Sequence, residues 1–195
     1  MKSGILTRIR RDIPDGIWSK CDSCGETTYQ NALERNSWIC PQCNSHFHIG
    51  FDKYIKLLLD AGTVDEINAG ISTADPLHFR DHRRYTDRIK DGRKNSTLNE
   101  AVWTGTGEIG GYRVAIGIMD TRYILGSMGG ATGEKIARLI DLAIDERRTL
   151  VIVCQSGGAR MQESTYSLMQ MAKISARLRM LANAGLLYVS ILTDP

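Results

Sequence analysis

Four cysteines within 23 residues constrain this chain more than any other feature of its sequence. They form two pairs, Cys21 with Cys24 and Cys40 with Cys43, and fifteen residues separate the pairs. A two-residue gap lets both thiolates of one turn reach a single tetrahedral Zn²⁺ at about 2.3 Å. Four thiolates leave no open coordination position. The spacing therefore predicts a structural zinc ribbon that holds one ion per chain.

The alternatives for these cysteines are weaker. Two disulfides would require export, and residues 1–20 contain no apolar segment of the kind found in signal peptides. His46 and His48 follow the second pair, but the four cysteines already complete the coordination shell. Gly25 and Asn44 each follow a pair, and both residue types tolerate the left-handed backbone that such turns need.

The composition is that of a globular chain. Of 195 residues, 42% are hydrophobic and 24% charged, and no apolar run approaches the length of a membrane span. This size predicts one domain, or one domain and a small module. A net charge of +3 is too small to indicate a nucleic-acid partner by itself.

The sequence divides into three parts. We expect a basic lead-in and the zinc ribbon over 1–50, a helical and polar connecting segment over 51–98, and an α/β domain over 99–195. In the connecting segment, residues 52–60 predict a helix with Asp52 as its N-cap. Further along, Asp91-Gly92 is expected to interrupt regular structure, as is Asp75-Pro76.

The last part alternates predicted strands and helices. Strands are expected over 113–119, 150–154 and 186–192, and their apolar runs favour burial on both faces. Helices are expected over 134–148 and 162–183, with Gly185 after the second. The side chains predicted to face inward are Ile136, Leu139, Ile140 and Ala143 in the first helix, and Leu168, Met171, Ala172, Leu178 and Leu181 in the second. This order predicts right-handed crossovers and an at least partly parallel sheet.

Two glycine-rich turns, 125–135 and 155–163, each lie between a predicted strand and a helix. Such turns allow a ligand to approach the backbone, and their outward N–H groups suit an anionic oxygen such as a phosphate or an enolate. The alternative is that the glycines only allow a helix to pack tightly on the sheet. For the pair of turns, ligand binding is the favoured interpretation.

Several other motifs do not indicate a catalytic site. The pattern Gly105-Thr-Gly-Glu-Ile-Gly110 precedes a strand rather than a helix, so a β-turn is expected there instead of a dinucleotide site. No histidine follows His82, so the α/β part has no histidine base. Cys154 ends an apolar strand and is expected to be a buried residue rather than a nucleophile.

The chain resembles the beta subunits of bacterial and plastid acetyl-CoA carboxylase carboxyltransferases. The strings that carry this resemblance are Ile17-Trp-Ser-Lys-Cys-Asp-Ser-Cys24, Leu33-Glu-Arg-Asn36, Tyr85-Thr-Asp-Arg88, Gly126-Ser-Met-Gly129, Ser156-Gly-Gly-Ala-Arg-Met-Gln-Glu163, Ser167-Leu-Met-Gln-Met-Ala-Lys173 and Ser190-Ile-Leu-Thr-Asp-Pro195. The resemblance implies an α/β fold in which an N-terminal four-cysteine zinc ribbon is followed by part of a ClpP/crotonase-like domain.

The resemblance also implies a reaction and partners. Carboxybiotin on a carrier protein would give its carboxyl group to acetyl-CoA, forming malonyl-CoA for fatty-acid synthesis. Backbone N–H groups would stabilise the acetyl enolate, and the decarboxylated biotin ureido nitrogen would take the proton. The implied partners are an alpha subunit in an α2β2 assembly, the biotin carboxyl carrier protein and biotin carboxylase. The implied location is the bacterial cytoplasm or the plastid stroma.

Site residues follow from the matching motifs. The implied zinc ligands are Cys21, Cys24, Cys40 and Cys43. The implied acyl-CoA and biotin region comprises Gly126, Ser127, Gly129, Gly130, Ser156, Gly157, Gly158 and Arg160. Lys135 and Arg160 could contact CoA phosphates or form ion pairs, and the sequence leaves both options open.

The chain departs from the family pattern in two places. Leu125 stands where the family usually has glycine, and a leucine there would narrow any channel beside the turn. The expected oxyanion glycines of the family lie beyond Pro195. If the 195 residues were the whole protein, we would expect no carboxyltransferase activity from them unaided.

Two other functions were weighed. In the first, a zinc-ribbon module without catalysis would bind nucleic acid or a partner protein through Arg8, Arg10, Arg11, Lys20 and Arg35. The few aromatic residues of the ribbon and the two glycine turns argue against this function. In the second, a stand-alone hydratase or thioesterase would need a carboxylate at the thioester, and Glu163 is the best-placed candidate.

Overall fold

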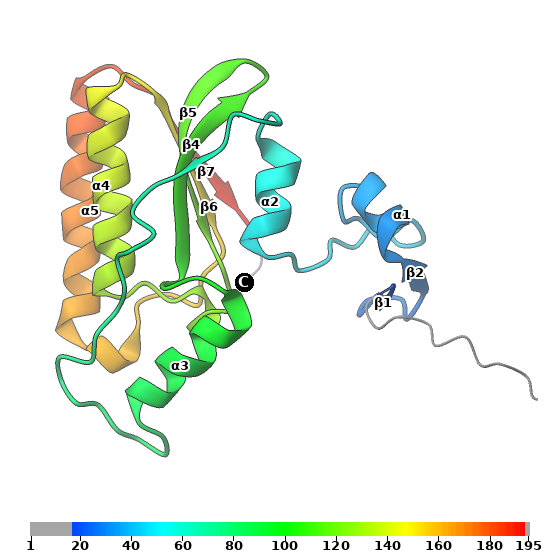
Figure 1. Ribbon diagram of the computed structural model, residues 1–195, viewed down its shortest axis with the longest axis horizontal. Helices are drawn as coiled ribbons and strands as arrows, with labels where there is room; N and C mark the ends of the chain where they lie inside the picture. The colour runs from blue at the N-terminus through cyan, green and yellow to red at the C-terminus, as the bar shows by residue number, and fades with distance from the viewer. Residues whose placement is uncertain (1–16, 194–195) are drawn as a thin grey trace, which may run out of the picture. The chain divides into compact units, whose positions relative to one another are not determined.

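The computed structural model describes residues 17–193, and the chain divides into two compact units between His48 and Ile49 (Figure 1). The first unit contains the four clustered cysteines. The second contains a five-stranded sheet and its helices, and it includes both the predicted connecting segment 51–98 and the α/β part.

The first unit is built around two short strands and a helix. Strands β1 (Trp18–Lys20) and β2 (Thr27–Tyr29) pair antiparallel, and α1 (Gln30–Arg35) follows directly. The rings of Trp18 and Tyr29 lie edge to face across this pair, 5.6 Å apart. Leu33 is fully buried. A core this small normally needs a metal to hold it.

The second unit is organised by one mixed sheet. Its strands, in spatial order, are β3 (Asp65–Glu66), β4 (Val102–Ile109), β5 (Tyr112–Met119), β6 (Thr149–Cys154) and β7 (Tyr188–Leu192). The pairs β3–β4 and β4–β5 are antiparallel, whereas β5–β6 and β6–β7 are parallel. The parallel half confirms the topology predicted from the alternation of strands and helices.

Helices cover both faces of this sheet. Helices α4 (Gly130–Asp145) and α5 (Thr165–Asn183) connect the parallel strands and lie side by side on one face, and α2 (Phe51–Leu58) packs on the other (Figure 1). The alternation of side chains along β5 supplies both cores, because Ala115 and Met119 face α4 whereas Ile116 faces α2. Each fully buried aliphatic side chain contributes about 1.5–3 kcal/mol relative to exposure.

The structure confirms most of the predicted elements of the α/β part. Strands β5 and β6 coincide with predicted runs, and α4 buries its four predicted residues. Helix α5 begins at Thr165, after a short 3₁₀ turn over Met161–Glu163, and Gly185 follows it with a φ of +70°.

Two predictions of burial were wrong. Leu168, Met171 and Ala172 of α5 are exposed, because this helix packs mainly beside α4 and presents Ile174, Leu178 and Leu181 to the sheet. Strand β7 was expected to be covered on both faces. It is largely exposed, and among the described residues no strand pairs with its outer edge.

The predicted turn at Gly105–Gly110 was also wrong in position. Strand β4 runs through Gly105 to Ile109, and the hairpin turns at Gly110-Gly111, where both φ angles are positive. A Cβ at Gly105 would lie 2.6 Å from the carbonyl oxygen of Asp65. That glycine therefore serves close strand packing rather than a turn.

The connecting segment is more regular than predicted. Helix α3 (Tyr85–Ser96) runs through Asp91-Gly92, and Gly92 faces the ring of Tyr123, which a Cβ would approach to 3.1 Å. The glycine thus permits close packing instead of ending the helix. Asp52 is not the N-cap of α2, which begins after Gly50; its carboxylate instead accepts a hydrogen bond from Arg122 at 2.8 Å.

None of the described helices has the length and apolar content needed to span a bilayer.

Candidate functional site

The cysteine cluster has the geometry of a tetrahedral metal site. All four sulfur atoms lie within 4.8 Å of one another, and the Sγ atoms of Cys21 and Cys43 are 3.6 Å apart, those of Cys24 and Cys40 3.7 Å. Four bonds of about 2.3 Å arranged tetrahedrally place sulfurs about 3.8 Å apart. The four thiolates therefore fit Zn²⁺, which would cross-link the two turns of the ribbon.

The two turns that carry the cysteines have the same backbone hydrogen bonds. The N–H of Gly25 donates to Cys21, and the N–H of Asn44 donates to Cys40, both at 2.9 Å. Gly25 and Asn44 have φ angles of +75° and +60°, which confirms the predicted left-handed positions. His46 does not belong to the cluster.

Of the basic residues weighed as nucleic-acid contacts, two lie in this unit. Lys20 ends β1, Arg35 ends α1, and both are exposed. Arg8, Arg10 and Arg11 lie outside the described residues.

In the second unit, the glycine turns lie at the same edge of the sheet. The first follows β5 and leads into α4, and the second follows β6 and leads toward α5. Because β5 and β6 are parallel neighbours, their carboxyl ends place both turns together. Ligands of open α/β sheets bind at such edges.

Backbone hydrogen bonds join the two turns into one structure. The N–H of Gly157 donates to the carbonyl of Leu125 at 2.9 Å, and the N–H of Met128 donates to Gly158 at 2.8 Å. Gly126 lies at the centre of this contact. It has a φ of +65°, and a Cβ there would lie 2.0 Å from the carbonyl oxygen of Gln155. Only glycine fits at that position.

These bonds use many of the N–H groups that were expected to point outward. The donors engaged within the protein are those of Gly126, Ser127, Met128, Gly130, Gly157, Gly158 and Arg160. Within 17–193, the N–H groups of Ser156 and Ala159 donate to no protein acceptor. Those two groups are among the donors that the second turn can offer to a ligand.

Ser127 and Arg160 belong to the interior behind the turns. The Ser127 hydroxyl donates to Ile124 at 2.7 Å and accepts from Nε of Arg160 at 3.2 Å. Arg160 is fully buried, and its Nη2 donates to the carbonyl of Ser127 at 2.7 Å and to Oε1 of Glu100 at 2.5 Å. Nη1 pairs with Glu163 at 3.2 Å. The sequence left open whether Arg160 contacts CoA phosphates or forms an ion pair, and in the structure it forms a buried ion pair.

Glu163 completes the same buried cluster. Its carboxylate accepts hydrogen bonds from the Gly130 N–H at 2.5 Å, the Tyr85 hydroxyl at 2.5 Å and the Thr73 hydroxyl at 2.8 Å. Burial alone would raise the pKa of Glu163, but these donors and the charge of Arg160 outweigh it and lower the pKa. A carboxylate with this many donors is held ionised and is not free to act as an acid or base at a thioester.

Lys135 is also internal. It is 1% exposed, and Nζ donates to the carbonyl of Val102 at 2.7 Å. Burial lowers its pKa, which the charges of Glu66 and Glu100 partly oppose. Lys135 therefore bonds to a backbone carbonyl in the interior, whereas the two buried carboxylates Glu100 and Glu163 pair with Arg160.

The sequence arguments gave no functional role to three members of this cluster, Thr73, Tyr85 and Glu100. Thr73 and Tyr85 are buried although they come from the segment predicted to be a polar connector, and Glu100 is buried just beyond its end. The sequence did contain one indication of this cluster. Glu100 lies two residues before the apolar start of β4, and a carboxylate is buried in such a place only with a partner.

A polar basin of about 470 Å³ lies beside the joined turns. Its lining includes residues of the turns, namely Leu125, Ser127, Gly157, Ala159 and Met161. It also includes residues of α3 and of nearby segments, namely Arg83, Arg88, Asp91, Asn95 and Arg122. Each of these arginines also pairs with an aspartate, Arg83 with Asp91, Arg88 with Asp81 and Arg122 with Asp120. The basin therefore combines guanidinium groups that are paired with aspartates, backbone donors and two exposed apolar side chains, and Asp91 also lines it.

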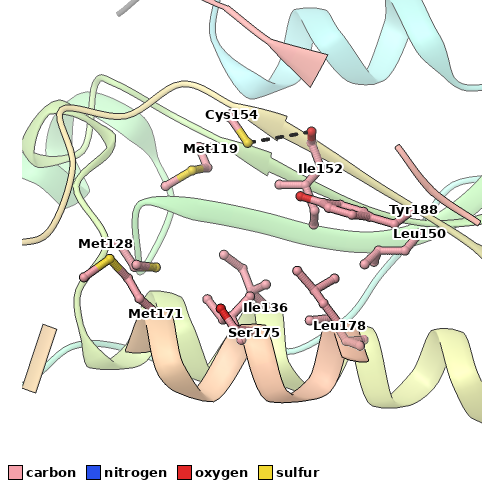
Figure 2. A pocket seen from close by; sticks show the side chains of 12 residues that line it. Met119, Met128, Ile136, Leu150, Ile152, Cys154, Met171, Ser175, Leu178 and Tyr188 are labelled. Carbon is pink, nitrogen blue, oxygen red and sulfur yellow. Dashed lines mark hydrogen bonds between the residues drawn. The ribbon is translucent and has the colours of Figure 1, made fainter. Parts of the chain in front are cut away.

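A second cavity, of about 380 Å³, lies between the sheet and helices α4 and α5 (Figure 2). Figure 2 shows side chains such as Ile136 and Leu178 entering it from the helices and Leu150 and Ile152 from β6. Cys154 lines its wall and is partly buried, with no charged group among the lining residues. The lining of this cavity is mostly apolar and contains no charged residue, so the polar basin is the better candidate for an anionic ligand.

Comparison with known families identifies the two units. Residues 73–195 match the carboxyl transferase domain, and residues 18–43 match the acetyl-CoA carboxylase zinc finger domain. Subunit beta of the acetyl-coenzyme A carboxylase carboxyl transferase of Chlorobaculum parvum is 44% identical over 98% of this chain and 68% of the relative. The chain belongs to this beta-subunit family.

A second member agrees with this assignment, and a solved structure agrees with the fold. The beta subunit of Synechococcus elongatus is 49% identical over 95% of this chain, which spans only 61% of that relative's length. A transcarboxylase 12S structure with hydrolysed methylmalonyl-coenzyme A bound has a TM-score of 0.62 and 24% identity, over 75% of this chain and 26% of the other. The second unit thus has the crotonase-like fold of carboxyl transferases, and the match to the zinc finger family supports zinc at the four cysteines.

Proposed function

We propose that this chain takes part in moving a carboxyl group from carboxybiotin to acetyl-CoA, as part of an acetyl-CoA carboxylase carboxyltransferase. The observation that carries the proposal is the joined pair of glycine turns at the carboxyl ends of β5 and β6 in a member of the beta-subunit family. Beside these turns lies the basin, whose lining has both polar and apolar groups, as acetyl-CoA does. Substrates and partners are inferred from that family.

In this proposal the acetyl-CoA thioester lies in the polar basin. The basin lining includes the guanidinium groups of Arg83, Arg88 and Arg122, a group that binds phosphates well, and each of them also pairs with an aspartate. The methyl carbon of acetyl-CoA gives its proton to the ureido nitrogen that decarboxylation leaves basic. The resulting enolate attacks the released CO₂, forming the new carbon–carbon bond of malonyl-CoA. The turns would bind anionic oxygen through the N–H groups of Ser156 and Ala159.

The buried cluster would act through the backbone. Arg160 binds the carbonyl of Ser127 in the first turn and belongs itself to the second, so it fixes one turn relative to the other. Thr73 and Tyr85 hold Glu163, which in turn holds the first N–H of α4. These are positioning roles, since the side chains are enclosed by protein. Zinc would support the ribbon without taking part in the reaction.

The proposed partners are an alpha subunit, with the α2β2 assembly of the family, the biotin carboxyl carrier protein and biotin carboxylase. We propose the cytoplasm of a bacterium or the plastid stroma as the compartment. Both relatives described above are bacterial beta subunits, which supports the partners and the first compartment.

The test is reconstitution. The zinc-loaded chain is mixed with a carboxyltransferase alpha subunit, carboxybiotin and acetyl-CoA, and malonyl-CoA is measured. A second arm extends the chain with the segment that the S. elongatus relative has beyond the matched region. Malonyl-CoA in the extended arm, with acetyl-CoA binding by the chain itself, is the expected result. A chain that binds zinc but neither binds acetyl-CoA nor yields malonyl-CoA in either arm would refute the proposal.

A further inference from the structure

Leu125 combines two features that are each unfavourable. Its backbone is left-handed, with φ +55° and ψ +31°, a conformation that bulky L-residues seldom adopt. Its side chain is 69% exposed, so packing inside the protein does not offset the free-energy cost of this backbone conformation. Residues that break local rules in this way concentrate at ligand sites.

The surrounding structure fixes this conformation firmly. The carbonyl of Leu125 accepts the Gly157 N–H at 2.9 Å, and the next residue, Gly126, donates to Tyr123 at 2.9 Å. Ile124 is also left-handed, and its carbonyl accepts both the N–H and the hydroxyl of Ser127. The backbone hydrogen bonds therefore hold Leu125 in its left-handed conformation, with the side chain exposed.

The exposed Leu125 side chain belongs to the lining of the polar basin. Leu125 lines the basin together with Met161, which is 68% exposed and comes from the other glycine turn. The two side chains are the most exposed apolar groups of the basin, whose lining also includes arginines and Asn95. The basin thus has both exposed apolar side chains and guanidinium groups in its lining.

We propose that Leu125, with Met161, forms an apolar lip that closes over the thioester arm of a bound acyl-CoA. This inference rests on the proposed function. The arginines of the basin lining suit the phosphates of the nucleotide part, and the lip suits the uncharged arm and its acetyl group. Leu125 is then a ligand-contact residue whose backbone strain is maintained for binding.

The test compares Leu125→Ala with Leu125→Gly in the zinc-loaded chain. Both variants remove the lip, but only glycine also relieves the left-handed strain. Calorimetric titration gives the affinity for acetyl-CoA and for adenosine 3′,5′-bisphosphate, which lacks the arm, and thermal unfolding gives Tm. Leu187→Ala serves as the control, since it removes a leucine that is 61% exposed and lies outside the basin.

We expect both Leu125 variants to bind acetyl-CoA about tenfold more weakly, because a buried leucine contact is lost. Affinity for the bisphosphate stays unchanged, and the Tm of Leu125→Gly rises above that of the parent. If Leu125 does not contact the ligand, the affinity for acetyl-CoA will be unchanged in both variants. If its role is only structural, the affinities for both ligands will fall together with the Tm. Either result overturns this inference but leaves the proposed function standing. A parent chain that binds neither ligand overturns both the inference and the proposed function.

Discussion

The charge of Arg160 is stabilised in the interior of the protein because hydrogen-bond acceptors surround its guanidinium group. Its guanidinium contacts Glu100, Glu163, the Tyr85 hydroxyl and the Ser127 carbonyl. Burial alone would lower the pKa of Arg160, but the charge of Glu100 and these hydrogen bonds raise it. Breaking such a buried pair leaves an uncompensated charge, which costs far more than losing a surface pair.

Replacing Arg160 by methionine therefore tests the cluster. We expect Arg160→Met to lower the free energy of unfolding by about 3–5 kcal/mol, because Glu100 and Glu163 lose their cation. Arg113→Met is the matched control, since Arg113 pairs with Glu146 at 3.3 Å on the surface, and its loss should cost under about 1 kcal/mol. Urea denaturation of both variants gives the measurement. Equal, small losses would show that the cluster contributes little.

The sequence could predict the glycine turns but not this cluster. Gly126 and Gly157 lie in recognisable strand-to-helix turns, so local composition was enough to find them. The partners of Arg160 come from positions 60 and 75 residues away, Glu100 and Tyr85. No local pattern reveals such partners, because only the folded chain brings them together.

At the scale of elements, charged pairs tie α5 to α4. Glu134 of α4 accepts a hydrogen bond from Lys173 of α5, and Asp141 pairs with Arg177 at 3.0 Å. The apolar period of α5 was correctly read as helical, yet three of its five inward residues were wrong. Periodicity locates an apolar stripe but cannot show whether a sheet, a neighbouring helix or solvent lies against it.

The link between α4 and α5 predicts a response to acid. Lys173 and then Arg138 lower the pKa of Glu134 from 4.5 to about 2. Because the folded-state pKa is depressed, the pair stabilises the fold above pH 4.5, and this stability is lost as the pH falls toward 2. Glu134→Gln should have a lower Tm than the parent at about pH 6, and the difference should shrink by about pH 3.

Thermal unfolding at several pH values checks this expectation. Since about a third of the Glu134 side chain is exposed, the effect should be modest. Glu108→Gln is the control, because it removes a carboxylate from β4 without touching the α4–α5 pair. Zinc release at low pH affects all three proteins alike and cancels in the comparison. A Tm difference independent of pH would contradict the assignment.

At the scale of the whole molecule, two units have separate cores. The ribbon buries Leu33 and two of its cysteines, whereas the second unit has extensive cores on both faces of its sheet. The cysteine spacing was sufficient to predict the first unit. The second was predicted in outline, although the exposure of β7 was not, since an apolar run does not show what covers it.

Metal removal should separate the two units. We expect a chelator to unfold residues 17–48, whose small core depends on zinc, while 49–193 stay folded. Hydrogen exchange followed by mass spectrometry measures each unit separately. Cys40→Ser should reproduce the effect, and Cys154→Ser should retain one zinc per chain. If the chelator removed hydrogen-exchange protection from both units together, the two units would fold as one, contrary to this expectation.

The cluster around Arg160 has a consequence for the order of folding. Its hydrogen bonds join residues as far apart as Thr73 and Glu163, which are 90 positions apart in the chain. Closing loops of this length loses entropy that the contact itself must offset, and contacts of this kind slow folding. The hairpin of β4 and β5 and the helix α4 have near neighbours in sequence and can form first. We therefore expect the joined turns to take their final shape late in folding, after most of the second unit has assembled.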